Sequence, residues 1–354
     1  MRKIVEAIRN SDKGVISYHT YINYALYDED YGYYSKASNK IGKTGDYYTS
    51  SVMTPIFAEI IAEYFIKMTN EYNLPVHFYE VGSGTGDFAY FFLEQIKKLS
   101  AKLLDKIHYF SVEKSNYHRQ LQKEKLGNFP VFFYEDISEL PQINGVVFSN
   151  EWLDALPVHV VQQVNGELKE VVIGEKNGSL YERLMKLSNE DIITYRNEYF
   201  SSNIPNNHRL EIPLSMVSNL RELYQKIIRG IVITIDYGWT NAQLIHPSRH
   251  TGTLRGFYKH QLLNNILTRT GEMDITHDIH IDTIQTLGEA FQFTTRRVYK
   301  QYDFLYELGL LSKLTNHENS DPFSIVSKRN RAIRSLIMDD SISSAFFVLI
   351  QEKL

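Results

Sequence analysis

The chain of 354 residues is 43% hydrophobic and 23% charged, an ordinary globular composition that allows one large or two medium domains. Its net charge of -4 at pH 7 provides no basic stripe for a nucleic-acid backbone, so we expect no nucleic-acid partner. The absence of cysteine excludes disulfides, thiolate metal sites and cysteine nucleophiles, and it fits a reducing compartment, from which we expect a cytoplasmic protein.

The first residues predict a helical and aromatic cap. Apolar residues have helical spacing over 4–8 and 16–26, and an aromatic, turn-prone region follows at 27–36. Residues 1–10 lack the apolar core of a secretion signal. Because no apolar run approaches the roughly 18 residues that span a bilayer, we expect no membrane insertion.

A polar, turn-prone stretch at 45–50 then leads into an amphipathic helix over 55–68. The stretch 45–50 lies shortly before the glycine-rich motif described next, and it could therefore fold over a cofactor. The alternative is that Thr49, Ser50 or Ser51 simply caps the following helix.

Residues 76–88 predict a strand, a tight turn and a helix, with three glycines at alternate positions in the turn. The glycines are Gly82, Gly84 and Gly86. A phosphate-binding loop would have a lysine after the last glycine, and the dinucleotide fingerprint would have glycine where Asp87 stands. Glu80 is awkward for a pyrophosphate and suits a cationic cofactor such as S-adenosylmethionine. The alternative is an ordinary strand-to-helix turn without a ligand.

Alternating elements continue the α/β pattern. They are a helix over 88–104, a strand over 107–112, a helix over 115–125 and a strand over 131–134. Glu113 ends the second strand, where an acid can accept hydrogen bonds from ribose hydroxyls, although its distance from Gly82 exceeds the usual ~20 residues and it could be a surface charge. Asp136, just beyond the third strand, would as a lone acid more often cap a helix.

A fourth strand over 145–149 runs directly into a polar segment. That segment is Asn150-Glu151-Trp152-Leu153-Asp154-Ala155-Leu156-Pro157. Two acids, an amide and a tryptophan thus crowd the carboxyl end of a central strand, where ligands bind in open α/β sheets. We place the chemistry here. The alternative is that Glu151 and Asp154 cap a helix stopped by Pro157.

Residues 158–181 predict a β-rich meander, because Asn165-Gly166 and Asn177-Gly178 are strong hairpin turns. Residues 188–214 look irregular. The α/β pattern resumes with a helix over 221–228, a strand over 231–235, a polar and aromatic loop over 251–260, a helix over 281–291, a strand over 293–299, a helix over 302–311 and a last strand over 343–351.

Five motifs together resemble the MidA-like family, a branch of the S-adenosylmethionine-dependent methyltransferases, over residues 15–310. They are Gly45-Asp46-Tyr47-Tyr48-Thr49-Ser50, Glu80-Val81-Gly82-Ser83-Gly84-Thr85-Gly86, Asn150-Glu151-Trp152-Leu153-Asp154-Ala155-Leu156-Pro157-Val158, Ile235-Asp236-Tyr237-Gly238 and Gly252-Thr253-Leu254-Arg255. Two positions depart from the family pattern. Ser83 stands where many relatives have proline, and Ser51 replaces the proline of a Ser-Pro pair.

The resemblance implies an α/β fold, a class I methyltransferase Rossmann-like sheet with an N-terminal helical cap and a β-rich insertion after strand four. The expected parts are the cap (1–44), the cofactor-binding half (45–157), the insertion (158–220) and the remainder of the Rossmann-like domain (221–354). The implied cofactor is S-adenosylmethionine, with S-adenosylhomocysteine as product. The candidate cofactor contacts are Glu80, Gly82, Ser83, Gly84, Thr85, Gly86, Glu113, Lys114, Asp136, Ile137 and Asn150. In such a fold Asp136 would face the adenine amino group.

The family includes a protein arginine methyltransferase, so we expect a protein substrate and methyl transfer to an arginine nitrogen. Paired carboxylates hold a planar guanidinium bidentately and leave one nitrogen facing the methyl donor. Glu151 would orient the acceptor, Asp154 would assist, and His260 or Tyr258 would close the pocket. A small-molecule methyltransferase, or a non-catalytic assembly or binding factor on the same fold, remains the alternative.

No metal site is expected. His277 and His280 lie near Asp274, Asp278 and Asp282, but their spacing fits a polar helix start better than a set of metal ligands.

Overall fold

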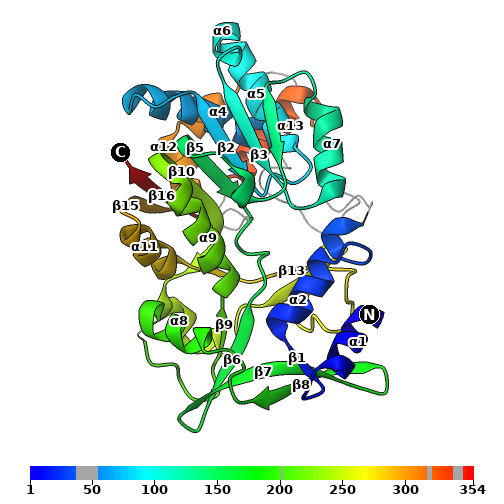
Figure 1. Cartoon of the computed structure of the whole chain (residues 1–354). Helices are drawn as coiled ribbons and strands as arrows, with labels where there is room; N and C mark the ends of the chain where they lie inside the picture. The colour runs from blue at the N-terminus through cyan, green and yellow to red at the C-terminus, as the bar shows by residue number, and fades with distance from the viewer. Residues whose placement is uncertain (37–54, 201, 317–320, 338–345) are drawn as a thin grey trace.

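The computed structural model describes residues 1–36, 55–200, 202–316, 321–337 and 346–354 (Figure 1). The polar stretch 45–50, which we expected to fold over a cofactor, lies outside these residues, as do the candidate caps Thr49, Ser50 and Ser51. Three sheets organise the described part: a central sheet of eight strands, a second of five and a third of three.

The central sheet has the strand order β15-β16-β10-β5-β2-β3-β4, with β14 beside β10. Its strands are β2 (His77–Val81), β3 (His108–Val112), β4 (Val131–Tyr134), β5 (Ile143–Asn150), β10 (Ile227–Trp239), β14 (Ile279–His280), β15 (Thr294–Lys300) and β16 (Phe346–Lys353). All are parallel except β16, which runs antiparallel between β10 and β15. This topology confirms the predicted α/β, class I methyltransferase fold.

The helices cover both faces of the central sheet or join the other sheets (Figure 1). They are α1 (Arg2–Asn10), α2 (Tyr18–Tyr27), α4 (Pro55–Glu71), α5 (Asp87–Leu99), α6 (Ala101–Leu104), α7 (Asn116–Leu126), α8 (Asp191–Tyr199), α9 (Leu214–Lys226), α10 (Asn241–Leu244), α11 (Ile281–Ala290), α12 (Gln301–Glu307) and α13 (Ile325–Ser335). Alternate residues of a strand face opposite sides, so Phe78 belongs to the core that includes α4 and α5, and Tyr79 belongs to the core that includes α9 and α11.

One predicted helix is broken. The segment 88–104 forms α5 and α6, which are separated at Ser100. The backbone of Ser100 is extended, and its side chain accepts a hydrogen bond from the Leu103 N–H, the geometry of an N-cap. A serine inside an amphipathic pattern can therefore end one helix and start the next.

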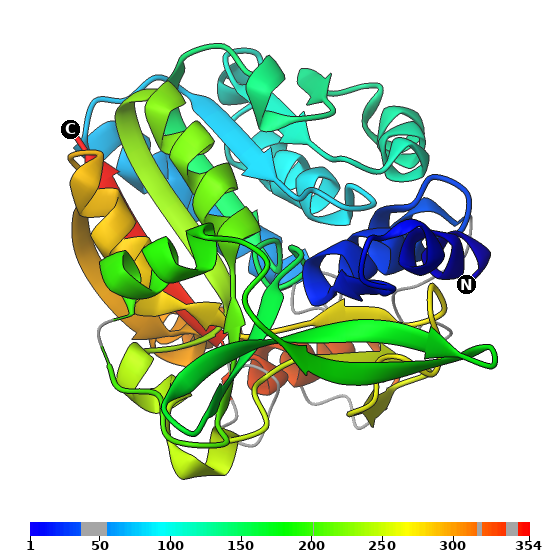
Figure 2. The same ribbon diagram turned by 60° about the horizontal axis from the view of Figure 1, so that its bottom comes forward.

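The second sheet contains the predicted insertion and also takes in part of the N-terminal segment. Its strands are β1 (Val15–Ser17), β6 (His159–Val164), β7 (Glu167–Lys176), β8 (Ser179–Met185) and β9 (Arg209–Ile212). The hairpins predicted at Asn165-Gly166 and Asn177-Gly178 are confirmed. Because β1 pairs with β7, the N-terminal helices and the insertion share one hydrophobic core. Figure 2 shows the blue N-terminal helices against the long green β-ribbon.

Residues 188–214 are more regular than predicted, since they contain α8 and β9. Helix α8 buries only Ile192 and Tyr195 among polar neighbours, so its apolar stripe is too narrow to stand out in the sequence. Strand β9 has four residues and pairs with β6 at the margin of the sheet.

The predicted loop over 251–260 contains a strand. The third sheet, in the order β12-β11-β13, consists of β11 (Arg255–Tyr258), β12 (Gln261–Leu263) and β13 (Asp274–Thr276). Lys259 and His260 form the two-residue turn between β11 and β12, and both have positive φ, 48° and 62°. Such turns normally contain Asn-Gly, so the pair Lys-His gives no hairpin signal in the sequence.

Candidate cofactor and acceptor site

A cavity of about 750 Å³ opens at the carboxyl ends of β2, β3, β5 and β10. The predicted site residues that line it are Glu80, Gly82, Ser83, Gly84, Thr85, Glu113, Lys114, Asp136, Ile137, Asn150, Glu151, Asp154 and His260. Gly86 is the predicted contact that does not line the cavity. A Cβ on Gly86 would meet the Cγ of Gln122 at 2.9 Å, so this glycine allows α7 to approach the turn.

The glycine turn is tightly packed on one side and open on the other. All three of its glycines have positive φ, which other residues rarely adopt. A Cβ on Gly82 would meet the Cβ of Trp152 at 2.9 Å, so the turn lies directly against the segment that follows β5. A Cβ on Gly84 would meet no heavy atom within 4 Å. The turn therefore leaves room on its cavity side for a ligand to approach the backbone.

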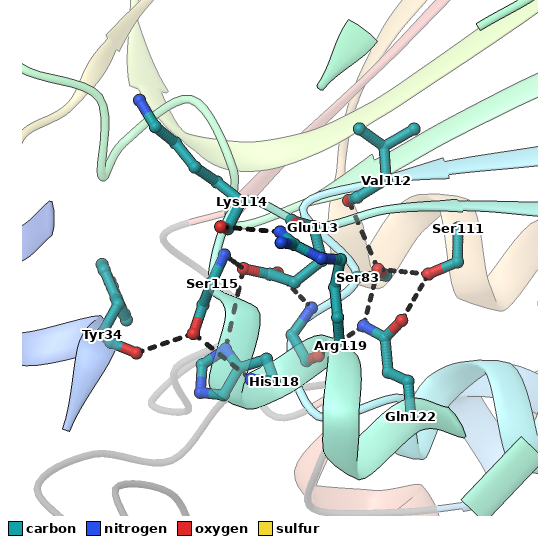
Figure 3. Close-up of polar contacts among 11 residues, drawn as sticks. Tyr34, Ser83, Ser111, Val112, Glu113, Lys114, Ser115, His118, Arg119 and Gln122 are labelled. Carbon is teal, nitrogen blue, oxygen red and sulfur yellow. Dashed lines mark hydrogen bonds and ion pairs between the residues drawn. The ribbon is translucent and has the colours of Figure 1, made fainter. Parts of the chain in front are cut away.

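A closed set of buried hydrogen bonds holds the turn in place (Figure 3). Gln122 donates to the Oγ of Ser83 at 2.9 Å and to the carbonyl of Gly84 at 2.6 Å, and it accepts from Ser111 at 2.7 Å. Since the hydroxyl proton of Ser111 points to Gln122, Ser83 is the donor in its 2.6 Å contact with Ser111. The departure from proline at position 83 thus supplies a hydroxyl that ties the turn to β3 and α7.

Glu113 bridges the turn and the start of α7. One carboxylate oxygen accepts the N–H of Gly84 at 2.8 Å and the other accepts the N–H of Ser115 at 2.8 Å (Figure 3). The oxygen that accepts from Gly84 keeps a further lone pair for another donor, and the other oxygen lies 3.7 Å from a ring nitrogen of His118. Glu113 is therefore a positioned carboxylate at the edge of the cavity and not a solvated surface charge.

Glu80 is buried at the carboxyl end of β2. The Tyr109 hydroxyl donates to its Oε2 at 2.6 Å. Burial, opposed by the hydrogen bond from Tyr109 and helped by the nearby Glu113, raises the pKa of Glu80 to about 8. A cationic group in the cavity would favour the ionised carboxylate, so this site fits a ligand that carries an ammonium or a sulfonium.

Lys114 and Asp136, which follow β3 and β4, line the cavity and also make contacts within the protein. The ammonium of Lys114 lies 5.4 Å from the ring centre of Tyr27. Asp136 accepts the N–H of Ser138 at 2.9 Å and so caps a short 3-10 helix, the role that we gave as its alternative. Asp136 nevertheless lines the cavity together with Ile137.

The N-terminal segment contributes a wall that the sequence did not indicate. The Tyr27 hydroxyl donates to the carbonyl of Ala155 at 2.9 Å, and the Tyr34 hydroxyl donates to Asp274 at 2.6 Å. The Ser115 hydroxyl donates to the carbonyl of Tyr34 at 2.9 Å. The sequence shows that residues 27–34 are rich in tyrosine. It does not show which residues, far away along the chain, these tyrosines contact.

The segment after β5 forms turns and no helix, so the helix-cap alternative for Glu151 and Asp154 is wrong. Glu151 has φ 52°, a left-handed conformation that is strained for a residue with a Cβ. Asn150 donates to its side chain at 2.9 Å. Asp236 accepts the backbone N–H groups of Leu153 at 3.0 Å and Asp154 at 3.3 Å. The hydrogen bonds to Asp236, on β10, therefore hold the segment after β5 in its strained conformation.

This half of the cavity is acidic. Asp154 is only 3% exposed, and burial, followed by the negative charges of Asp236 and Asp274, raises its pKa well above the ordinary value. Burial and the charge of Glu151 raise the pKa of Asp236 to about 8. Arg255, the cation that acts on Asp154, is itself paired with Asp278 at 2.7 Å. The carboxyl groups here favour a positively charged partner.

Of the two residues that we expected to close the pocket, His260 lines the cavity and Tyr258 is not among the lining residues. Side chains alternate along β11, so Phe257 faces the cavity and Tyr258 faces the other way. The guanidinium of Arg269 lies 4.3 Å from the ring centre of Tyr258 on that other face.

The two histidines near Asp274 are buried and engaged elsewhere. A ring nitrogen of His277 lies 3.2 Å from the carbonyl of Leu156, and one of His280 lies 2.7 Å from the hydroxyl of Tyr195. Burial lowers the pKa of His277 to about 4 and of His280 to about 3. Within the described residues, no group of three or more histidines and acids could hold a metal ion.

Residues 60–298 match the model of a family of S-adenosyl-L-methionine-dependent methyltransferases. The chain belongs to this family. The resemblance to the MidA-like branch and the choice of S-adenosyl-L-methionine as cofactor are both confirmed. The methyltransferase has no helix, in the ranges that the structure describes, that is long and apolar enough to cross a bilayer.

Curated relatives of the methyltransferase carry the name mitochondrial protein arginine methyltransferase NDUFAF7. The protein of Xenopus tropicalis is 24% identical over 326 residues, covering 84% of this chain and 73% of the relative. Those of Danio rerio and Homo sapiens are 24% and 23% identical, covering 94% and 88% of this chain and 82% and 73% of the relatives. Because these relatives are named as mitochondrial, the expectation of a cytoplasmic location is wrong; the absence of cysteine was too weak a basis for it.

Solved structures confirm the fold of the methyltransferase. A COG1565 superfamily member from Burkholderia thailandensis, in a crystal structure bound to S-adenosyl-homocysteine, superposes with a TM-score of 0.87 at 23% identity, covering 99% of this chain and 92% of that one. A native structure of a protein of the same superfamily and organism gives a TM-score of 0.84 with the same coverage.

Proposed function

We propose that the methyltransferase modifies a nitrogen of an arginine side chain in a protein. The observation that carries this proposal is the buried carboxyl group of Asp154, which lines the cavity together with Glu151. A guanidinium presents paired N–H donors in one plane, which is the arrangement that neighbouring carboxylates hold best. The names of the relatives, which are protein arginine methyltransferases, support the same acceptor.

The cofactor would lie in the half of the cavity formed by the glycine turn. Glu80 would face its cationic end, Gly84 would allow close approach of the backbone, and Glu113 would accept hydrogen bonds from the ribose hydroxyls. Asp136 and Ile137 would lie at the adenine. When bound, S-adenosylmethionine supplies an electrophilic methyl group on a sulfonium sulfur.

The acid-rich half would position the acceptor. Glu151 would accept two N–H groups of the guanidinium and so direct the remaining nitrogen toward the methyl donor. As the nitrogen–carbon bond forms and the sulfur–carbon bond breaks, the nitrogen loses a proton. Asp154 would accept it, because the cation in the cavity would favour the ionised form of its buried carboxyl group. His260, at the tip of the β11–β12 hairpin, would help to exclude water.

The test is methyl transfer from radiolabelled S-adenosylmethionine in a lysate of the source organism. We expect a labelled protein band whose hydrolysate contains methylarginine. A labelled small metabolite would instead identify a small-molecule methyltransferase. Tight binding of S-adenosylhomocysteine without any labelled product would indicate a non-catalytic binding factor.

A further inference from the structure

The small sheet β12-β11-β13 turns one of its faces toward the cavity. Asp274 and Thr276 are two residues apart on β13, so their side chains lie on the same side, and both line the cavity. Phe257 on β11 is paired directly opposite Asp274 and lines the cavity as well. Ile275, between the two polar residues, is buried in the core shared with the N-terminal helices.

This face stands next to the segment that follows β5. The N–H of His277, the residue after β13, donates to the carbonyl of Asp154 at 3.0 Å. Tyr27 lies near enough to both Asp154 and Asp274 for each to raise its pKa. The wall made by Phe257, Asp274 and Thr276 therefore belongs to the acceptor half of the cavity, next to Asp154.

One polar atom of this wall has no partner. Thr276 is 6% exposed, and its Oγ1 makes no hydrogen bond to any of the described residues. Buried hydroxyls in folded proteins are almost always hydrogen-bonded. Because Thr276 lines the cavity, a ligand inside the cavity can supply the missing partner.

Asp274 is held in a fixed position. It is 3% exposed, and the Tyr34 hydroxyl donates to its Oδ1 at 2.6 Å. Tyr34 is in turn fixed by the hydrogen bond from Ser115 to its carbonyl. The bond from Tyr34 fixes one oxygen of Asp274 in the cavity wall, and a cation in the cavity would favour the ionised form of this carboxyl group.

We propose that Phe257, Asp274 and Thr276 form a recognition site for the guanidinium of the acceptor. Asp274 accepts N–H groups on the edge away from Glu151, Thr276 accepts a further N–H, and the ring of Phe257 packs against the face of the cation. This inference rests on the proposed function, because it names the site that would select an arginine side chain. It predicts rejection of citrulline, a neutral side chain of the same shape.

The test measures binding of two small probes, N-acetyl-arginine amide and N-acetyl-citrulline amide. Each is titrated by NMR into full-length protein saturated with S-adenosylhomocysteine. We expect the wild type to prefer the arginine probe and Asp274→Asn to weaken that probe by about tenfold or more, as for the loss of a charge-assisted hydrogen bond. The citrulline probe should change less than about twofold.

Two further variants separate recognition from folding. Thr276→Val keeps the shape and removes the hydroxyl, so it should weaken the arginine probe several-fold, whereas Thr276→Ser should retain the wild-type affinity. Asp191→Asn removes one negative charge at an exposed position on α8 and should leave both probes unchanged. All variants should bind S-adenosylhomocysteine like the wild type.

The outcomes distinguish this inference from the proposed function. A wild type that binds both probes equally would overturn the arginine acceptor itself, and the recognition site with it. A wild type that prefers arginine, with the preference intact in Asp274→Asn, would overturn the recognition site alone. The recognition site would also be overturned if Asp191→Asn weakened binding of the arginine probe as much as Asp274→Asn does, because the effect would then be one of net charge.

Discussion

The two halves of the cavity are assembled in different ways. The cofactor half comes from a short stretch of chain, in which a turn after one strand and acids after the next two strands meet at one edge of the sheet. The acceptor half joins the N-terminal segment, the end of β5 and the small sheet, as the bond between Tyr34 and Asp274 shows. Cofactor binding therefore depends on local geometry, and acceptor binding depends on distant contacts.

The largest effect should come from Gly84→Val, which should destroy the cofactor half alone. Gly84 has φ 54° and its free side opens to the cavity, so a branched side chain would strain the turn and occupy ligand space. Calorimetric titration with S-adenosylhomocysteine should show a loss of affinity of about 100-fold or more, as for strain combined with lost backbone contacts. Gly166→Ala is the matched control, since Gly166 has φ 85° in an open hairpin turn and does not line the cavity.

Glu151→Gln should affect the acceptor half and leave the cofactor half intact. The amide keeps the shape but loses the charge that orients a guanidinium, so the rate of protein labelling should fall by about 100-fold. Affinity for S-adenosylhomocysteine should stay within about twofold. Glu289→Gln, at an exposed position on α11, should retain full activity. Labelling at the wild-type rate would remove Glu151 from the mechanism.

A smaller effect is the release of a proton from Glu80 when a cofactor binds. The pKa of Glu80 is raised to about 8 by burial, so the group is mainly protonated at pH 7 in the free protein. A cation beside it lowers that pKa, and binding of S-adenosylmethionine at pH 7 should release up to about one proton. Calorimetry in buffers of different ionisation enthalpy measures this number. Glu80→Gln should abolish the release; an unchanged value would assign the proton to another group.

The smallest effect should come from Ser83→Ala, which removes one hydroxyl from the buried set around Gln122. The expected cost is about 1 kcal/mol of the free energy of unfolding, because one hydrogen bond is lost and its partners can reorganise. Chemical denaturation measures it, and affinity for S-adenosylhomocysteine should change by less than about threefold. A loss of cofactor affinity as large as that of Gly84→Val would mean that the turn depends on this serine.

The same contrast explains how much the sequence could predict. The glycine turn, the acids after successive strands and the hairpins at Asn165-Gly166 and Asn177-Gly178 are local patterns, and the structure has the turn and hairpins where they were expected. Gly86 shows the limit of this reasoning: the glycine is needed for packing against Gln122, which no pattern within the turn reveals.

The acceptor half could not be predicted because its contacts are long-range. Asp274 was seen only as part of a polar helix start, whereas in the structure it lies on a strand and accepts from Tyr34. That strand has three residues, and its sheet turns at Lys259 and His260, a pair that is unusual in such turns. The sequence could not show whether Phe257 or Tyr258 faces the cavity, because that depends on which face of β11 lies against it.

The position of β16 has a consequence for how the protein is made. This strand follows both β10 and β15 in the sequence, yet it lies between them and pairs with both. During synthesis, β10 keeps an unpaired edge and β15 lacks a partner until residues 346–353 have left the ribosome. Unpaired strand edges promote aggregation, so the nascent chain should be vulnerable in the interval between the synthesis of β15 and the release of β16.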